Sequence, residues 1–156
     1  MSNGVLDRGA VHATSLVVGE DGVLIRGASG AGKSALAREV VALAGGAGRH
    51  AALVCDDRVH LSAASGRLIA RAVPAIAGLL EIRSVGIVRV PHQDAAVIRL
   101  VVDFAQEEAS RLPEDGADRI LLGGIELPRI TVNGPLAPGM VLWQLEHLRD
   151  GSVTVP

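Results

Sequence analysis

An eight-residue stretch of the chain has the composition of a phosphate-binding loop. It fits the pattern of glycine, any four residues, glycine, lysine and then serine or threonine, and it reads Gly27-Ala28-Ser29-Gly30-Ala31-Gly32-Lys33-Ser34. Glycines let backbone N–H groups approach phosphate oxygens, and a following helix adds the partial positive charge of its N-terminus. Lys33 would reach the terminal phosphates, and the Ser34 hydroxyl would ligate Mg²⁺. The stretch predicts a nucleotide or phosphate site without naming the reaction; a chance glycine-rich turn is the alternative.

Two adjacent carboxylates, Asp56 and Asp57, follow the short apolar run Ala51–Cys55. If that run is a buried strand of an open α/β sheet, the pair emerges at the carboxyl end, where such folds bind ligands. One carboxylate would hold Mg²⁺ through water while the other would accept the proton of an attacking hydroxyl. The alternative is an acidic surface turn paired with Arg58.

Four more side chains are candidates for the same site. His12 precedes the strand that enters the loop, and its imidazole either lies near the loop or is satisfied by a backbone carbonyl. Glu81 and Arg83 are two residues apart, which predicts that they share one face of a strand. They either pair with each other at the surface, or Glu81 is a second magnesium ligand and Arg83 faces phosphate. Arg111, in a loop-like segment, either reaches the site or is solvated.

The elements that would position these residues are short strands and two helices. Leu36, Val40 and Leu43 recur at helical spacing after the loop, and Gly45-Gly46 supplies a stop. The first two strands are joined by a turn and predict a hairpin. Strands are predicted over residues 11–18, 23–26, 51–55, 59–63, 67–72 and 97–102 and within 120–132, and a second helix is predicted after Pro138-Gly139. This order predicts an α/β fold with a mixed sheet.

Composition limits the classes of function. The 156 residues have the size of one domain, so we expect a single domain over residues 1–156. Phe104 and Trp143 are the only aromatic residues and the formal net charge is −2, which argues against a nucleic-acid partner. Cys55 is the only cysteine, so no internal disulfide is possible. No stretch resembles a signal peptide or a membrane span, and we expect a cytoplasmic protein without a membrane partner.

Taken together, these residues resemble the HPr kinase/phosphorylase family. The resemblance rests on His12, the loop from Gly27 to Ser34, the Asp56-Asp57 pair and the block Leu80-Glu81-Ile82-Arg83-Ser84-Val85-Gly86-Ile87. It covers most of the chain, and this combination is far more specific than the loop alone. It implies a short form with only the catalytic domain, a P-loop fold related to phosphoenolpyruvate carboxykinase, and a hexamer.

The resemblance also implies an activity with ATP and Mg²⁺ as cofactors. The substrate would be a seryl residue of HPr or a related phosphocarrier protein of the sugar phosphotransferase system, and the family's reverse reaction is phosphorolysis. By similarity, Lys33 binds the transferred phosphate, Ser34 and Glu81 hold Mg²⁺, and His12 supports the site. The identity of the carrier, the choice between ATP and pyrophosphate as donor, and the regulatory ligand do not follow from the sequence.

Two residues carry the implied proton transfer and charge stabilisation. Asp57 would accept the serine proton in phosphorylation and donate a proton in phosphorolysis, and Arg111 resembles a catalytic arginine. The chain departs from the family where Ala137 stands in place of an arginine, which weakens the case for phosphorolysis; the residues needed for the kinase direction are all present. Two alternatives remain: a P-loop kinase of a small metabolite, and a regulatory module that binds ATP without catalysis.

Overall fold

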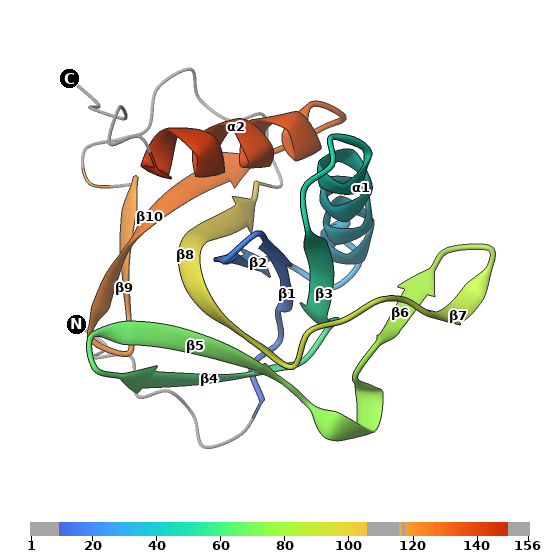
Figure 1. Ribbon diagram of the computed structural model, residues 1–156, viewed down its shortest axis with the longest axis horizontal. Helices are drawn as coiled ribbons and strands as arrows, with labels where there is room; N and C mark the ends of the chain where they lie inside the picture. Colours follow the sequence, from blue (N-terminus) through green and yellow to red (C-terminus); the bar gives the residue numbers. More distant parts are fainter. Residues whose placement is uncertain (1–9, 106–115, 117, 150–156) are drawn as a thin grey trace.

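The computed structural model describes residues 10–105, 116 and 118–149 of the chain. Its main sheet contains β1 (Thr14–Val18), β2 (Asp21–Arg26), β3 (Ala51–Cys55), β4 (Val59–Ala64), β5 (Arg67–Ala72), β8 (Ala95–Phe104), β9 (Arg119–Leu122) and β10 (Ile125–Val132). The order in this eight-stranded sheet is β3-β1-β2-β8-β10-β9, and β5 joins through β8 while β4 joins through β5 (Figure 1). The predicted α/β fold with a mixed sheet is confirmed.

Three parallel strands form the centre of the sheet, because β2 and β10 both pair with β8 in the same direction. The predicted N-terminal hairpin is confirmed: β1 and β2 are antiparallel, and Val18 pairs with Asp21 across a two-residue turn. Gly19 in this turn has φ 61°, a conformation that glycine adopts without steric cost. Strand β8 pairs with β5 at its beginning and with β2 at its end, and it curves strongly between them (Figure 1).

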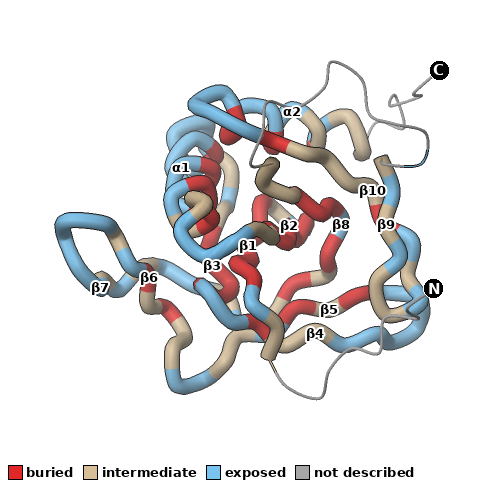
Figure 2. Tube along the Cα trace, turned by 180° about the vertical axis from the view of Figure 1, so that it is seen from behind, coloured by how far each residue is buried: buried red, intermediate tan, exposed pale blue. Residues whose placement is uncertain are grey.

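Two helices, α1 (Lys33–Gly46) and α2 (Ala137–Arg149), pack on one face of the central strands. Leu36 and Val40 of α1 and Val141 and Leu145 of α2 are buried in one apolar cluster with residues of β1, β2 and β8. A second cluster on the opposite face joins the central strands to the β4–β5 hairpin. Strands β1 and β2 lie between the two clusters and are almost entirely buried (Figure 2). Neither helix in the described part of the chain is both long and apolar enough to cross a membrane.

A separate hairpin of β6 (Leu79–Ile82) and β7 (Gly86–Arg89) follows a 3₁₀ turn, η1 (Pro74–Ile76), and projects away from the main sheet (Figure 1). It carries the block from Leu80 to Ile87. The prediction that Glu81 and Arg83 share a strand face is wrong, because β6 ends at Ile82 and Arg83 lies in the following turn. Ser84 has φ 69° in that turn, which ends the strand alternation.

Three other predictions needed adjustment. The first strand begins at Thr14 instead of residue 11, and Val11 makes only an isolated bridge to Val59. Leu43 is 50% exposed, because the smaller Ala44 takes the buried position in the last turn of α1. Helix α2 begins at Ala137 instead of after Pro138-Gly139, since proline is tolerated in the first turn of a helix, where its missing N–H costs nothing.

Candidate active site

The glycine-rich stretch forms the connection between β2 and α1, as its sequence predicts. Gly30 and Gly32 have φ values of 79° and 112°, which a residue with a side chain rarely adopts. The first residue of this stretch, Gly27, packs on the end of β8: a Cβ at Gly27 would lie 3.0 Å from Cβ of Phe104. The two loop glycines supply the turn, while Gly27 allows the loop to lie closely against the sheet.

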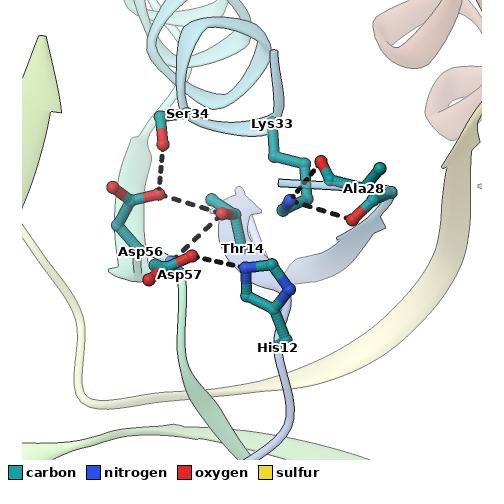
Figure 3. Close-up of polar contacts among 8 residues, drawn as sticks. His12, Thr14, Ala28, Lys33, Ser34, Asp56 and Asp57 are labelled. Carbon is teal, nitrogen blue, oxygen red and sulfur yellow. Dashed lines mark hydrogen bonds and ion pairs between the residues drawn. The ribbon is translucent and has the colours of Figure 1, made fainter. Parts of the chain in front are cut away.

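Lys33 is the first residue of α1, and only 6% of it is exposed. Its ammonium group donates hydrogen bonds to the backbone oxygens of Gly27, at 2.9 Å, and Ala28, at 3.0 Å (Figure 3). A lysine ammonium has three N–H donors, and the two carbonyls account for two of them. The cation is therefore held over the loop, at the place where the loop amides and the helix N-terminus attract anions.

Asp56 is buried and connects three elements. Its Oδ1 accepts hydrogen bonds from Oγ of Ser34, at 2.7 Å, and from Oγ1 of Thr14, at 2.9 Å (Figure 3). Ser34 belongs to α1, Thr14 to β1, and Asp56 follows β3, so the carboxylate fixes the helix start against the two strands. Thr14 escaped sequence reasoning, although its position two residues after His12 in an extended segment was the available signal.

Asp57 has φ 66°, in the left-handed region that aspartate tolerates better than most residues. Consecutive strand residues point to opposite sides, and this conformation lets Asp56 and Asp57 both face the loop. Oδ1 of Asp57 lies 2.6 Å from Nε2 of His12, and the Asp57 backbone N–H donates a hydrogen bond to Oγ1 of Thr14 at 3.2 Å (Figure 3). The His12 and Asp57 side chains are 48% and 66% exposed, so this pair is accessible to a reactant. His12 thus contacts a carboxylate instead of a backbone carbonyl.

A cavity of about 680 Å³ brings most of the candidate residues together, and His12 is connected to it through its contact with Asp57. The phosphate loop forms one wall, and the acidic pair and the β6–β7 hairpin form others. Its lining comprises Ser29, Gly30, Ala31, Gly32, Lys33, Ser34, Ala35, Arg38, Asp56, Asp57, Glu81, Ile82 and Arg83. Glu81 and Arg83 therefore lie at the same cavity even though they do not share a strand face. Arg111 lies outside the described residues.

An ionic cluster that the sequence reasoning missed lies directly beside the loop. Arg26, the residue before Gly27, donates two hydrogen bonds to Asp103, at 2.8 and 2.7 Å, and Arg129 donates a third to the same carboxylate. Burial by itself raises the pKa of Asp103, but the hydrogen bonds and positive charges of the two arginines outweigh it and lower the pKa below the ordinary value. The three residues come from β2, β8 and β10, so the cluster ties the parallel strands together next to the loop.

The donor set fits Mg²⁺ bound to a polyphosphate. Magnesium prefers oxygen ligands and commonly takes one or two carboxylates together with water and phosphate oxygens. Asp56, with the Ser34 hydroxyl at 2.7 Å, and Glu81 at the same cavity provide that chemistry. Among residues 10–105, 116 and 118–149, no group of three or more histidine, cysteine, aspartate or glutamate side chains could hold a metal by itself.

A second cavity, of about 530 Å³, lies elsewhere in the fold. It is lined by residues near the beginnings of β2, β8 and β10 and by Leu145 and Leu148 of α2. Because the phosphate loop follows the end of β2, this cavity is at the opposite edge of the parallel strands. It contains none of the candidate residues, and the chemistry is therefore concentrated in the cavity beside the loop.

The chain resembles known proteins in sequence and in fold. The sequence pattern of the family described as HPr Serine kinase C-terminal domain matches residues 5–143. Among solved structures, the chain is similar to the Hpr(Ser) kinase/phosphatase from Coxiella burnetii, with 24% sequence identity and a TM-score of 0.74. That alignment covers 92% of this chain and 98% of the other, and it supports the fold. No curated protein matched the chain.

Proposed function

The chain belongs to the HPr serine kinase C-terminal domain family, and on that premise we propose that it is a protein-serine kinase that transfers the γ-phosphoryl group of ATP to a seryl hydroxyl of HPr or a related phosphocarrier protein. The observation that carries this proposal is the cavity beside the loop. A cation held at the loop, a hydroxyl–carboxylate pair and an exposed carboxylate that contacts a histidine all meet there. Phosphoryl transfer requires such an arrangement, since its catalysis is mostly positioning and charge stabilisation.

In the proposed reaction, Asp57 accepts the proton of the attacking serine. The Oγ–phosphorus bond forms while the bond between the γ-phosphorus and the bridging oxygen breaks, and ADP leaves with that oxygen. His12 contacts Oδ1 of Asp57, which fixes the carboxylate and presents Oδ2 to the incoming hydroxyl. A general base must lie within hydrogen-bond reach of the proton that it takes, and 66% exposure allows Asp57 that approach.

The remaining residues stabilise charge on the phosphates. Lys33 would exchange its carbonyl partners for oxygens of the transferred phosphoryl group, and the loop amides would bind the other phosphates. Ser34, Asp56 and Glu81 would hold Mg²⁺, which neutralises the charge that develops on the leaving oxygen. Arg83, at the same cavity, offers a further positive charge.

The reverse direction receives less support from the residues. Ala137, at the position where the family resemblance implies an arginine, is 2% exposed and belongs to the apolar core beside α1. A buried alanine supplies no charge to an incoming inorganic phosphate. We therefore assign the kinase direction to this chain and expect little pyrophosphate release from serine-phosphorylated carrier and inorganic phosphate.

The decisive experiment incubates the purified chain with Mg-ATP and the phosphocarrier proteins of its source and locates any added phosphate by mass spectrometry. We expect phosphate on one carrier serine, and none with the Lys33→Ala variant, because the variant removes the cation at the transferred group. Transfer that survives in Lys33→Ala would reject the assigned site. If the chain binds ATP and phosphorylates no carrier protein, but does phosphorylate a small hydroxyl compound, it is a metabolite kinase.

A further inference from the structure

The β6–β7 hairpin has two faces with different surroundings. Leu80 pairs with Val88, and these residues face the core: Leu80 is 3% exposed and Val88 packs against the helix-side cluster. The opposite face carries Glu81, which pairs directly with Ile87, and Leu79, which pairs with Arg89. Directly opposed residues in an antiparallel pair have their side chains close together on one face. Ile87 therefore lies beside Glu81, the carboxylate assigned to Mg²⁺.

Large apolar side chains are unusually exposed on this hairpin. Ile87 is 71% exposed and Val85, in the turn, is 68% exposed. Arg83 and Arg89 flank them and are also exposed. Most of the hairpin tube is coloured as exposed in Figure 2. An isolated two-stranded hairpin is only marginally stable in water, and burial of β-branched side chains by a partner would stabilise it. We call Arg83, Val85, Ile87 and Arg89 the hairpin rim.

The hairpin rim is continuous with the cavity of the proposed reaction. Glu81, Ile82 and Arg83 line that cavity, and Val85 and Ile87 follow within a few residues in the turn and the paired strand. ATP and Mg²⁺ occupy the inside of such a cavity, while a protein acceptor must approach from its edge. The rim carries two arginines, and the only acidic residue of the hairpin is assigned to Mg²⁺, so the surface that it offers is apolar and positive.

From this geometry we propose that the hairpin rim is the docking surface for the protein substrate, which rests on the proposed function. Val85 and Ile87 contact apolar side chains next to the acceptor serine, and Arg89, which does not line the cavity, contacts an acidic side chain of the carrier. Because Ile87 is paired with Glu81, this contact holds the carrier protein next to the cavity that contains the phosphate loop and Asp57. The rim therefore selects a serine with apolar neighbours over a free hydroxyl compound.

The test is steady-state kinetics with purified HPr as the varied substrate. The variants are Val85→Ser and Ile87→Ser, singly and together, with Leu121→Ser as the matched control, since Leu121 is 41% exposed on β9. For the double variant we expect KM for HPr to rise about tenfold or more, as for truncated interface residues that contribute strongly to binding. We expect kcat at saturating HPr and Kd for ATP to stay at their wild-type values, because neither side chain lines the cavity. Arg89→Glu should also raise KM, and that rise should shrink with added salt.

Several outcomes would overturn the inference. An unchanged KM in the double variant, or an equal rise in Leu121→Ser, would exclude the hairpin rim as the docking surface. Sedimentation velocity distinguishes another occupant: if the double variant dissociates an oligomer and its KM changes only for that reason, the rim joins copies of this chain. Absence of transfer by the wild-type chain would reject the kinase itself, and calorimetric binding of HPr then decides the docking surface separately. If the wild-type chain binds HPr and the double variant does not, the hairpin rim remains the docking surface. If the wild-type chain does not bind HPr, the hairpin rim is rejected as the docking surface.

Discussion

Asp56 and Asp57 are neighbours in the chain, yet their carboxylates have different surroundings. Asp56 is buried and accepts two hydroxyl donors, whereas Asp57 is largely exposed and contacts His12. Carboxylates in such different environments commonly divide the work of a site, one binding and the other exchanging a proton. The left-handed conformation of Asp57 makes this division possible, because it turns both side chains toward the loop.

Replacing Asp57 with Asn tests its assigned role. We expect phosphoryl transfer to fall by about 10²–10⁴-fold, the usual contribution of a general base, while ATP binding is retained. Single-turnover transfer to HPr and titration with ATP measure the two quantities. If ATP binding were lost as well, Asp57 would act mainly as a metal ligand. The control is Asp94→Asn, which removes one surface charge, since the Asp94 side chain is 94% exposed.

Thr14 holds both members of the acidic pair, since its hydroxyl donates to Asp56 and accepts from the Asp57 backbone. Thr14→Val keeps the shape and removes both hydrogen bonds, which leaves the Asp57 N–H and the buried Asp56 carboxylate without that partner. We expect the free energy of unfolding to fall by about 1–2 kcal/mol and kcat to fall with it, whereas Thr14→Ser should restore both. Urea unfolding and transfer kinetics check this. A kcat that Thr14→Val leaves at the wild-type value would show that Thr14 does not position the pair.

At the scale of elements, the Arg26–Asp103–Arg129 cluster joins β2, β8 and β10 immediately before the phosphate loop. Asp103→Asn removes the negative charge that accepts hydrogen bonds from the two partly buried arginines, and we expect the free energy of unfolding to fall by about 2–3 kcal/mol at neutral pH. Breaking such a pair removes the charge that holds the strands together at the edge where the loop begins. The exposed Asp94→Asn variant should change stability little.

The stability difference between wild type and Asp103→Asn should depend on pH in a direction set by the pKa of Asp103. The pKa of Asp103 is lowered in the folded state, so the charged carboxylate stabilises the fold fully above its unfolded pKa of about 3.9. This stabilisation is lost as the pH falls through the lower folded pKa. Urea unfolding of wild type and Asp103→Asn from pH 7 to pH 3 should show a gap that is constant at neutral pH and narrows below about pH 4. A gap that stays constant to pH 3 would contradict an ionic origin.

Elements with strong local signals could be predicted from the sequence. Short-range spacing and turn residues predict the strand, loop and helix around Lys33 and the hairpin of β1 and β2. They also predict the strand Ala51–Cys55 and the strands β4 and β5. The β6–β7 hairpin was harder, because β7 is only four residues long and its turn uses Ser84 instead of a glycine at the left-handed position. The start of α2 at Ala137 was missed because proline normally reads as a boundary, whereas the first turn accepts it.

The distances between the site residues depend on the fold of the whole molecule, and local sequence patterns do not predict them. Ser34, Asp56 and Glu81 come from three separate segments, and only the arrangement of α1, β3 and the β6–β7 hairpin brings them to one cavity. His12, just before β1, contacts Asp57 of that cavity. Their residue types predicted the chemistry, and the distances between them required the fold. Arg129 had no sequence signal of its own, because its importance arises from pairing between strands far apart in the chain.

Because the site joins so many elements, ligand binding should stabilise the entire fold. A ligand at 100 times its Kd that binds only the folded state adds about 2.7 kcal/mol, and a chain of this size gains about 2–4 °C in Tm per kcal/mol. We therefore expect Mg-ATP to raise Tm by about 5–10 °C, and ATP with a chelator to raise it less. Glu81→Gln should lose the part of the Tm rise that depends on Mg²⁺, and Lys33→Ala should lose most of the Tm rise. Thermal unfolding followed by circular dichroism measures both. An equal shift in wild type and Lys33→Ala would mean that the nucleotide binds somewhere other than the phosphate loop, since Lys33 is the buried cation of this site.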